Sequence, residues 1–337
     1  MKALEIERPG VARLVERPEP QAGSGEVLVR VAYAGLCGTD LSTFLGKNPL
    51  IAYPRVIGHE IAGDVVALGA EVDARWLGRR VAVSPYKNCG TCAACRVGRP
   101  NACSRNETLG VQRDGALTEL AAVPVTRLVP SDTLPLDLLA MVEPFSIGMH
   151  AVRRTEVEAG DTVLVLGCGG VGAGAIAAAA ERGARVIGLD LDERKLAQAT
   201  ALGATDVIDG AAPDVAGRVR SMTGGEGPSV VIEAVGNAAT YRLALDVVAP
   251  CGRIGCIGWL KGDVPLEARL IVLKEVDIRG SRNATDELSA VVAMFESGRI
   301  DPRPLVTHRV SLDEVPAMFE RWAAAPAAVG KILVAVS

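Results

Sequence analysis

Four cysteines are grouped within one short stretch of this chain. Cys89, Cys92, Cys95 and Cys103 follow the pattern C-x2-C-x2-C-x7-C. Thiolates at this spacing suit a tetrahedral zinc ion, at sulfur–metal distances of about 2.3 Å, because a short loop can wrap around the ion. Bacterial-type iron–sulfur runs end in about three residues and then Cys-Pro, whereas seven residues precede Cys103 and Ser104 follows it. The pattern predicts a zinc site, with an iron–sulfur cluster and a set of disulfides as alternatives.

A second group of possible metal ligands is more dispersed. The chain has only three histidines, His59, His150 and His308. Glu60 follows His59, and Cys37 lies 22 residues before His59. A thiolate, an imidazole and a carboxylate form a mixed ligand set that suits a catalytic zinc with one open position. Taken singly, such a histidine or cysteine is usually a packing residue, so the interpretation depends on the combination.

A glycine-rich turn follows an apolar run at residues 162–166. It reads Gly167-Cys168-Gly169-Gly170-Val171-Gly172 and opens an alanine-rich helical pattern. Glycines at this spacing let the backbone approach a pyrophosphate, whose charge is stabilised by the free N–H groups of a helix N-terminus. We predict a dinucleotide-binding turn. The alternative is a Rossmann-type protein in which the glycines serve only strand–helix packing.

The next apolar run ends at an acidic residue, Asp190, 23 positions after Gly167. A carboxylate at this place accepts hydrogen bonds from the adenosine ribose hydroxyls. Because it also repels a 2′-phosphate, Asp190 predicts NAD rather than NADP. Cys168 has no histidine near it in the sequence, so we interpret it as a packing residue rather than a nucleophile.

The N-terminal residues MKALEIERPG lack the basic start and apolar core of a secretory signal. No apolar run reaches the roughly 18 to 20 residues of a membrane span. We therefore expect a cytoplasmic protein with reduced thiols, which disfavours the disulfides. With 49% hydrophobic residues, 23% charged residues and a net charge of −4, the 337-residue chain is expected to form two globular domains. Its scattered basic residues argue against a nucleic-acid partner.

The predicted secondary structure that must position these residues changes near residue 145. Before it, turn residues separate strand-like runs at 26–33, 63–68 and 80–84, which predicts a β-rich, barrel-like body. After residue 161, strands and helices alternate, which is typical of a parallel sheet. The predicted elements are strands 162–167, 184–190, 230–236 and 253–259, with helices ending near 182 and spanning 193–202. After residue 280 the alternation stops, and we expect the strand at 331–336 to return to the first domain.

Several motifs occur in one order that resembles the zinc-dependent medium-chain dehydrogenases. They are Cys37-Gly38-Thr39-Asp40, Gly58-His59-Glu60, the four-cysteine loop, Glu143-Pro144 and the turn at 167–172. The segment at 143–151 is similar to the E-P-x-S-x-G-x-H-A segment of the sorbitol, threonine and sugar-acid 5-dehydrogenase branch. The resemblance implies an α/β fold class. A GroES-like β-rich catalytic domain would span 1–145 and 282–337, and a Rossmann-fold NAD-binding domain with a doubly wound parallel sheet would span 146–281.

The resemblance also implies two zinc ions, a structural one in the four-cysteine loop and a catalytic one. It places Cys37, His59 and Glu60 around the catalytic zinc, with Glu143 as a fourth ligand or one water away. Asp40 would orient the imidazole of His59.

The implied reaction needs a route for the substrate proton. The resemblance places Thr39 where it would take the first proton. Ser42 stands where related enzymes carry a histidine that continues the relay, and a serine does not titrate near pH 7. Proton release would then run through ribose hydroxyls and water, or through Glu60 and Glu143.

Further cofactor contacts follow from the same resemblance. Lys195 is similar to a basic residue beside the adenosine ribose, although a solvated helix lysine is the alternative. The backbones at Val235, Ile257 and Gly258 end strands on the ligand-binding side of such sheets and would line the nicotinamide and its ribose. Cys251 and Cys256 are interpreted as packing residues.

Arg282 and Asn283 are the predicted substrate residues. Arg282 would pair with a substrate carboxylate or several hydroxyls, whereas the alternative is a surface arginine paired with Asp286 or Glu287. The predicted function is NAD-dependent oxidation of a secondary alcohol of a hexonate such as L-gulonate or L-galactonate, of a polyol or of a sugar. The alternatives are a threonine or other small-alcohol dehydrogenase and a non-catalytic regulator that binds zinc and NAD. The family implies a homodimer or homotetramer without a membrane partner.

Overall fold

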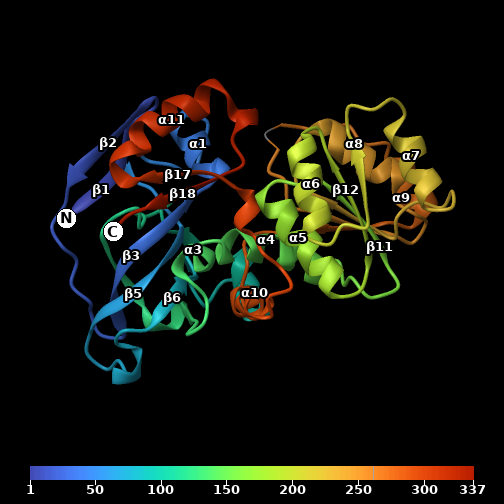
Figure 1. The fold of residues 1–337 in the computed structure, drawn as a ribbon. Coiled ribbons are helices and arrows are strands. Elements are labelled where there is room, and N and C mark those ends of the chain that lie inside the picture. The colour runs from blue at the N-terminus through green and yellow to red at the C-terminus, as the bar shows by residue number, and fades with distance from the viewer. Residues whose placement is uncertain (261) are drawn as a thin grey trace. The chain divides into compact units, whose positions relative to one another are not determined.

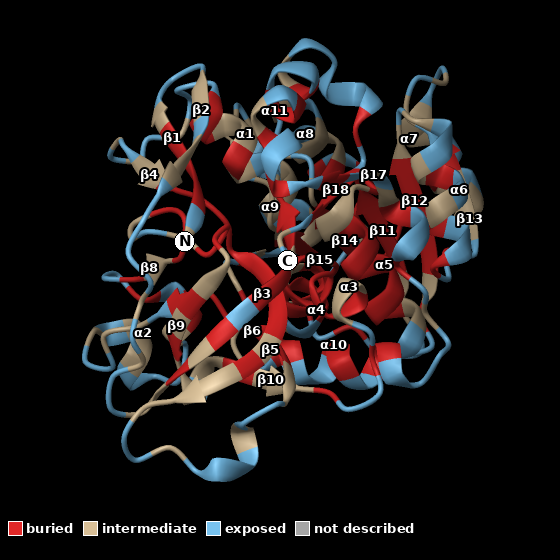
Figure 2. Ribbon diagram, turned by 60° about the vertical axis from the view of Figure 1, so that its left-hand side comes forward, coloured by how far each residue is buried: buried red, intermediate tan, exposed pale blue. Residues whose placement is uncertain are grey.

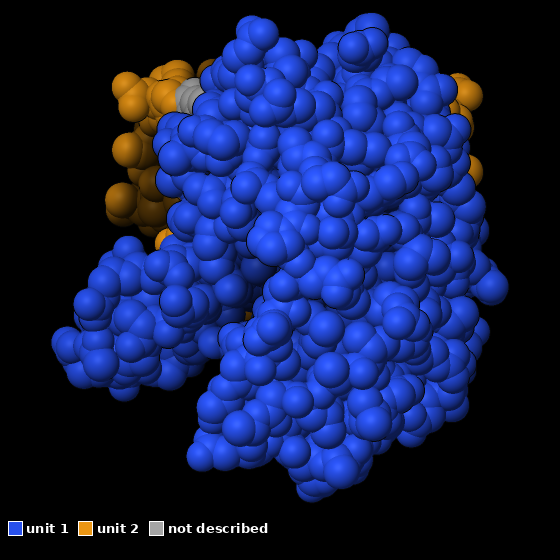
Figure 3. Space-filling model, turned by 90° about the vertical axis from the view of Figure 1, so that its left-hand side faces the viewer, with its two compact units in different colours: residues 1–143, 288–337 blue, residues 144–287 orange. Residues whose placement is uncertain are grey.

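The computed structural model describes residues 1–260 and 262–337. The chain divides into two compact units, which Figure 3 colours blue and orange. Unit 1 comprises Met1–Glu143 with Leu288–Ser337, and unit 2 comprises Pro144–Glu287. Each unit has its own cluster of buried apolar side chains. None of the helices among the described residues combines the length and hydropathy that a membrane crossing requires.

Unit 1 is built on a strongly bent, seven-stranded sheet whose main path runs β10-β6-β5-β3-β18-β17, with β9 added against β3. The strands are β3 (Glu26–Leu36), β5 (Glu60–Leu68), β6 (Arg80–Val83), β9 (Leu120–Pro124), β10 (Leu128–Pro130), β17 (Val306–Ser311) and β18 (Lys331–Ala335). The C-terminal strand β18 pairs antiparallel with β3, where Leu36 faces Ile332. The first and last parts of the chain therefore share one sheet, as Figure 1 shows.

Smaller elements complete unit 1. They are β1 (Lys2–Arg8), β2 (Val11–Glu16), β4 (Arg55–Val56), β7 (Tyr86–Lys87), β8 (Glu107–Thr108), α1 (Gly38–Phe44), α2 (Ala93–Arg96), α3 (Leu136–Leu139), α11 (Val315–Ala324) and six short 3-10 helices among the described residues. Strands β2, β1 and β4 form one sheet, and β7 and β8 form a two-stranded ribbon. The chain passes from one unit to the other within two helices, α4 (Val142–Arg154) and α10 (Glu287–Glu296).

Unit 2 contains a six-stranded parallel sheet in the order β13-β12-β11-β14-β15-β16. Its strands are β11 (Thr162–Leu166), β12 (Arg185–Asp190), β13 (Asp206–Asp209), β14 (Val230–Glu233), β15 (Arg253–Cys256) and β16 (Asp277–Gly280). Its helices are α5 (Gly170–Glu181), α6 (Glu193–Ala201), α7 (Val215–Met222), α8 (Ala238–Val247) and α9 (Ala268–Lys274). Figure 1 shows α5 and α6 on one side of the strands and α7, α8 and α9 on the other. This doubly wound sheet confirms the predicted fold class.

The sequence of unit 2 explains why its centre is buried. Strand β11 presents four consecutive buried residues, which is typical of a parallel strand covered on both faces, and Figure 2 shows its neighbourhood in red. Helix α5 is almost entirely buried because small residues let α4 approach it closely. A Cβ on Gly148 of α4 would lie 2.2 Å from the backbone nitrogen of Ala175. Larger residues at this contact would force the two helices apart.

Candidate metal centres and nucleotide site

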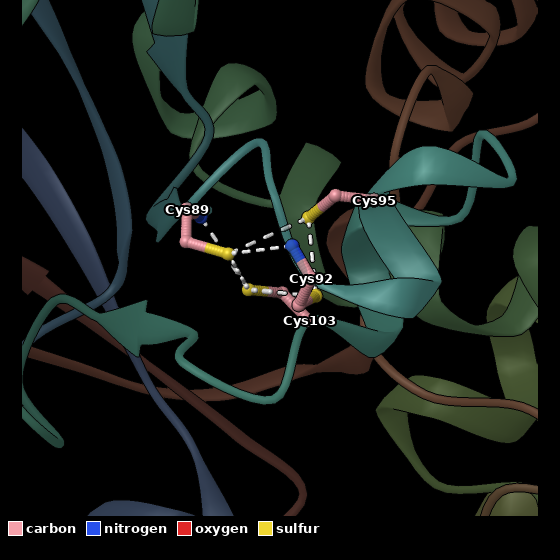
Figure 4. Close-up of side chains that lie close together, drawn as sticks. All are labelled: Cys89, Cys92, Cys95 and Cys103. Carbon is pink, nitrogen blue, oxygen red and sulfur yellow. Dashed lines mark hydrogen bonds between the residues drawn. The ribbon is translucent and has the colours of Figure 1, made fainter.

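The four sulfur atoms of the cysteine loop lie together between β7 and β8, as Figure 4 shows. The Sγ atom of Cys92 is 3.5 Å from that of Cys95 and 3.8 Å from that of Cys103. Cys89 is 3.5 Å from Cys103 and 4.0 Å from Cys95. Thiolates that surround a tetrahedral zinc at about 2.3 Å are about 3.8 Å apart, so the group fits this ion. Disulfides require sulfur atoms about 2.05 Å apart, so the structure excludes that alternative.

Backbone amides stabilise thiolates in this loop. The N–H group of Cys92 donates to the sulfur of Cys89, and that of Arg105 donates to the sulfur of Cys103. Both nitrogen–sulfur distances are 3.3 Å. Hydrogen bonds from the Thr91 and Cys92 backbone lower the pKa of the Cys89 thiol to about 5. These amides thus favour the deprotonated form of Cys89 that zinc requires, whereas burial and the neighbouring thiols raise the pKa of Cys95 to about 11.

The second group lies where β3 ends and β5 begins. Cys37 caps the N-terminus of α1, while Glu60 opens β5 and pairs with Gly35 of β3. This pairing brings Cys37 beside His59 and Glu60, and the ligand atoms of the three residues lie within 4.8 Å of one another. His59 and Glu60 are buried, with 6% and 1% of their surfaces exposed. A half-buried thiol beside a buried imidazole and a buried carboxylate fits a catalytic zinc.

Asp40 lies in the first turn of α1, next to Cys37 and His59. One of its carboxylate oxygens accepts the backbone N–H of Cys37 at 2.8 Å. The other lies 3.8 Å from Nδ1 of His59, which is too long for a hydrogen bond. Both atoms are buried and lack a hydrogen-bond partner among the described residues. Buried polar atoms without partners are rare and often mark an ion site, which supports metal binding here.

Lys331 also lies beside this group, which sequence reasoning missed. Its ammonium group is buried and donates to the carboxylate of Glu60 and to the carbonyl oxygen of Leu36, the latter at 3.2 Å. A buried carboxylate is costly unless a cation or hydrogen bonds compensate it. The only signal was a lysine at the first position of an apolar strand, and its partner depends on how β18 pairs with β3.

Glu143 has a different partner, the phenol of Tyr86, which sequence reasoning also missed. The hydroxyl of Tyr86 donates to Oε1 of Glu143, and both side chains are buried. Burial, together with the nearby Glu60 carboxylate, raises the pKa of Glu143 to about 7. Glu143 is not in the group whose ligand atoms all lie within 4.8 Å.

The residues predicted for proton transfer lie on α1. The hydroxyl of Thr39 is 3.7 Å from the sulfur of Cys37. Ser42 donates its hydroxyl to the backbone carbonyl of Thr39 at 2.9 Å. The Ser42 proton is thus committed to the helix backbone in this conformation.

The glycine-rich turn joins β11 to α5 in unit 2. Gly167 has a φ angle of +92°, which favours glycine. A Cβ on Gly172 would lie 1.7 Å from the carbonyl oxygen of Gly167, so no other residue fits there. The two glycines thus let the turn pack closely against the start of α5, where the free N–H groups of a helix N-terminus can bind a pyrophosphate. Cys168 is buried, and burial raises the pKa of its thiol to about 12, which agrees with a packing role.

Asp190 anchors this turn as well as ending β12. One carboxylate oxygen accepts the N–H of Cys168 at 2.8 Å, and the other accepts the N–H groups of Leu191 and Asp192. The ammonium group of Lys195 lies 3.9 Å from Asp190. The carboxylate is therefore fixed beside the turn, with a cation close to it.

We expect Asp190→Ala to lower the affinity for NADH by about 10- to 100-fold, because the charged hydrogen bonds to the ribose hydroxyls are lost. NADPH affinity should fall much less, because the same change removes the repulsion of a 2′-phosphate. Fluorescence titration with each cofactor measures both affinities. Asp192→Ala, which removes the cap of α6, is the control and should leave the NADH/NADPH ratio unchanged. Equal losses for the two cofactors in Asp190→Ala would contradict the ribose assignment.

One buried residue organises the two loops predicted to line the nicotinamide. Oε1 of Glu233 accepts the N–H groups of Val235 and Gly236 at 3.0 and 2.8 Å. Its backbone carbonyl accepts the N–H groups of Ile257 and Gly258 at 2.9 and 3.1 Å. Glu233 thus ties the loops after β14 and β15 together. The sequence showed only an acidic residue inside an apolar strand.

The remaining cysteines differ from each other. Cys256 is partly buried in β15, and burial raises its thiol pKa to about 11. Cys251 is exposed and has a φ angle of +57°. The prediction of a packing role for Cys251 is therefore wrong, because the residue sits in the turn that precedes β15 rather than within the strand.

The other predicted residues follow β16 or lie on α4. Arg282 is exposed, and Asn283 is half-buried with a φ angle of +54°. Glu287, one of the acidic residues considered as a partner for Arg282, is 2.8 Å from Nδ1 of His150 and 3.1 Å from Arg153. Although burial opposes it, the hydrogen bond with His150 helps to lower the pKa of Glu287 to about 2. His150 is thus hydrogen-bonded to the ion-paired Glu287 in unit 2, whereas the candidate metal ligands belong to unit 1.

Comparison with known proteins agrees with this geometry. Residues 23–135 match the alcohol dehydrogenase GroES-like domain and residues 170–297 match the zinc-binding dehydrogenase family. L-galactonate-5-dehydrogenase of Escherichia coli K12 is 34% identical over 95% of each chain. Sorbitol dehydrogenase of Bacillus subtilis 168 is 33% identical over 95% of this chain and 93% of its own.

A solved structure extends the comparison to the whole fold. The short chain alcohol dehydrogenase RspB of Escherichia coli CFT073, in complex with NADH, has a TM-score of 0.92 and 30% identity. The match covers 100% of this chain and 99% of that one. With its four-cysteine loop, its group of Cys37, His59 and Glu60 and its doubly wound parallel sheet, the chain belongs to the zinc-dependent medium-chain alcohol dehydrogenases.

Proposed function

We propose that this enzyme oxidises a secondary alcohol of a sugar acid, polyol or sugar with NAD. The observation that carries the proposal is the group of Cys37, His59 and Glu60, whose three ligand atoms lie within 4.8 Å of one another. Three protein ligands are typical of catalytic zinc sites, whereas structural sites have four. Relatives that act on L-galactonate and sorbitol support this substrate class.

In the proposed mechanism, Cys37, His59 and Glu60 hold the catalytic zinc, which when bound lowers the pKa of a substrate hydroxyl as a Lewis acid. Asp40 keeps the imidazole of His59 in its ligating orientation. Oγ1 of Thr39, 3.7 Å from the Cys37 sulfur, takes the first proton. The turn at 167–172 and Asp190 hold NAD for hydride acceptance.

The substrate class rests on Arg282 and Asn283, which we propose as the residues that bind the substrate's carboxylate and hydroxyls. We expect Arg282→Ala to raise KM for hexonates by about 10-fold or more and to affect neutral polyols much less, because a bidentate carboxylate pair is lost. NADH appearance over hexonates, polyols, aldoses and threonine measures the effect and tests the function itself. Arg299→Ala, at an exposed arginine of unit 1, is the control.

Different results of this screen separate the alternatives. Equal losses for acids and polyols in Arg282→Ala would contradict the carboxylate role. Turnover of threonine alone would support an amino-alcohol dehydrogenase. A protein that binds zinc and NADH but oxidises none of these compounds would be a regulator rather than an enzyme.

We also infer the organisation of the whole protein. Residues 1–145 and 282–337 form the catalytic domain and residues 146–281 the NAD-binding domain. We propose a cytoplasmic homodimer or homotetramer, in which two copies join through β16. This strand is at the edge of its sheet, and Ile278 on it and Val272 and Leu273 on α9 are exposed. A molar-mass measurement in solution should give at least twice the mass of one chain.

A further inference from the structure

Two buried carboxylates lie at the catalytic centre, but the structure gives them different partners. Glu60 accepts a hydrogen bond from the ammonium group of Lys331, whereas Glu143 accepts one from the phenol of Tyr86. Glu60 belongs to the group of ligand atoms within 4.8 Å of one another, and Glu143 does not. The phenol of Tyr86 is thus one of the groups that fix the position of this second carboxylate.

Tyr86 is well suited to hold a carboxylate in a fixed place. It is 4% exposed and lies on β7, where it pairs with Thr108 of β8. The neighbouring backbone is also fixed, because the carbonyl oxygen of Pro85 accepts the N–H of Leu109 at 3.0 Å. A buried tyrosine has few rotatable bonds, and its hydroxyl needs a partner. Its phenol is therefore a rigid donor aimed at Glu143.

The same ribbon connects this donor to the structural zinc loop. Cys89, the first thiolate of that loop, comes three residues after Tyr86, and β8 follows Cys103, its last thiolate. The ribbon of β7 and β8 thus closes the base of the four-cysteine loop. An intact loop fixes β7, and β7 fixes the phenol.

A fourth protein ligand would change the chemistry of the catalytic zinc. Sites with four protein ligands are structural, whereas catalytic sites keep a position for substrate. We propose that Tyr86 is a positioning residue of the catalytic centre, whose phenol holds Glu143 beside the metal rather than on it and so preserves the position that substrate occupies. The proposal rests on the proposed zinc-dependent function but concerns a residue that no zinc ligand pattern includes.

Replacing the phenol by a phenyl ring tests this role. In Tyr86→Phe the ring still fills the core, but Oε1 of Glu143 loses its donor in a buried place. We expect Glu143, once it is released from this donor, to move onto the zinc ion as a fourth ligand. We expect the catalytic zinc to leave the holoenzyme about 10-fold more slowly when a chelator competes for it, and kcat to fall by about 10- to 100-fold. A tyrosine that merely supports the fold would instead speed zinc loss.

The measurement is the rate of zinc transfer from the holoenzyme to a chromogenic chelator, which needs no substrate. The phase that belongs to the catalytic ion is the one absent in His59→Ala. Tyr53→Phe is the matched control, because the phenol of Tyr53 donates at 2.5 Å to the backbone carbonyl of Thr43 rather than to a metal-site carboxylate. It should change neither the release rate nor kcat.

A second pair of variants makes the test independent of any general weakening of the fold. In Glu143→Gln the side chain is a neutral amide, which is a poor zinc ligand, so Tyr86→Phe should not slow zinc release in that background. Cobalt substituted at the catalytic site should change its visible spectrum in Tyr86→Phe but not in the double variant. Faster zinc loss in Tyr86→Phe, or the same slowing with and without Glu143→Gln, would overturn the proposal. A failed substrate screen with slowed zinc release would overturn only the proposed function.

Discussion

Replacing His59 with alanine is expected to lower kcat by at least about 10³-fold, because it removes several kcal/mol of metal-dependent transition-state stabilisation. His59 supplies the imidazole of a three-residue ligand group and is 6% exposed. Loss of this ligand should also release one of the two zinc ions expected per chain. NADH binding should persist, since the glycine-rich turn and Asp190 belong to the other unit.

Three measurements follow this variant: kcat, zinc content by elemental analysis and NADH affinity by fluorescence. His308→Ala is the control, because His308 is half-buried on β17 and its Nδ1 lies 2.8 Å from the hydroxyl of Thr307. The control should keep both zinc ions and full activity. An active His59→Ala enzyme that retains both ions would refute the role of His59 as a ligand.

Replacing Cys103 with serine is expected to remove the other zinc ion and to destabilise unit 1. The Cys103 sulfur is buried and accepts N–H groups from Cys89 and Arg105. Losing a structural metal belongs to the mechanisms with large effects on stability. A loss of about 3 to 5 kcal/mol corresponds to a fall in Tm of about 10 °C for a unit of this size.

Calorimetry and elemental analysis measure these two effects. Cys251→Ser is the control, because Cys251 is exposed and lies outside both metal groups. This control should keep the wild-type Tm and zinc content. Unchanged stability in Cys103→Ser, with the zinc still bound, would mean that three thiolates suffice and that the loop does not depend on its fourth.

Residues whose role follows from local spacing could be predicted from the sequence. The glycines at 167–172 show their function through the strand before them and the helix after them, and the four cysteines through their spacing. Strand β12 could be predicted to end at Asp190 because its apolar run ends there. Local sequence patterns also predicted the difference between the β-rich first part and the second part, in which strands and helices alternate.

Residues whose role depends on distant pairing could not be predicted. Lys331 contacts Glu60 across 271 positions, and Tyr86 contacts Glu143 across 57. Neither contact can be recognised from a periodicity or a spacing in the sequence. The first depends on the register of β18 against β3, and the second on the path of the two-residue strand β7. The role of Glu233 could not be predicted for a related reason, because this residue accepts hydrogen bonds from backbone N–H groups of two separate loops.

The pairing of β18 with β3 has a consequence for the order in which the protein matures. Unit 2 is a continuous segment, Pro144–Glu287, whereas unit 1 needs both Met1–Glu143 and Leu288–Ser337. Domains fold as units during synthesis, so the nucleotide-binding sheet can be complete while the ribosome still holds β18. Lys331 reaches Glu60 only when that strand arrives. We therefore expect a nascent chain to become competent to bind NAD before Lys331 can compensate the charge of Glu60, and the catalytic zinc to be loaded in the last stage of biogenesis.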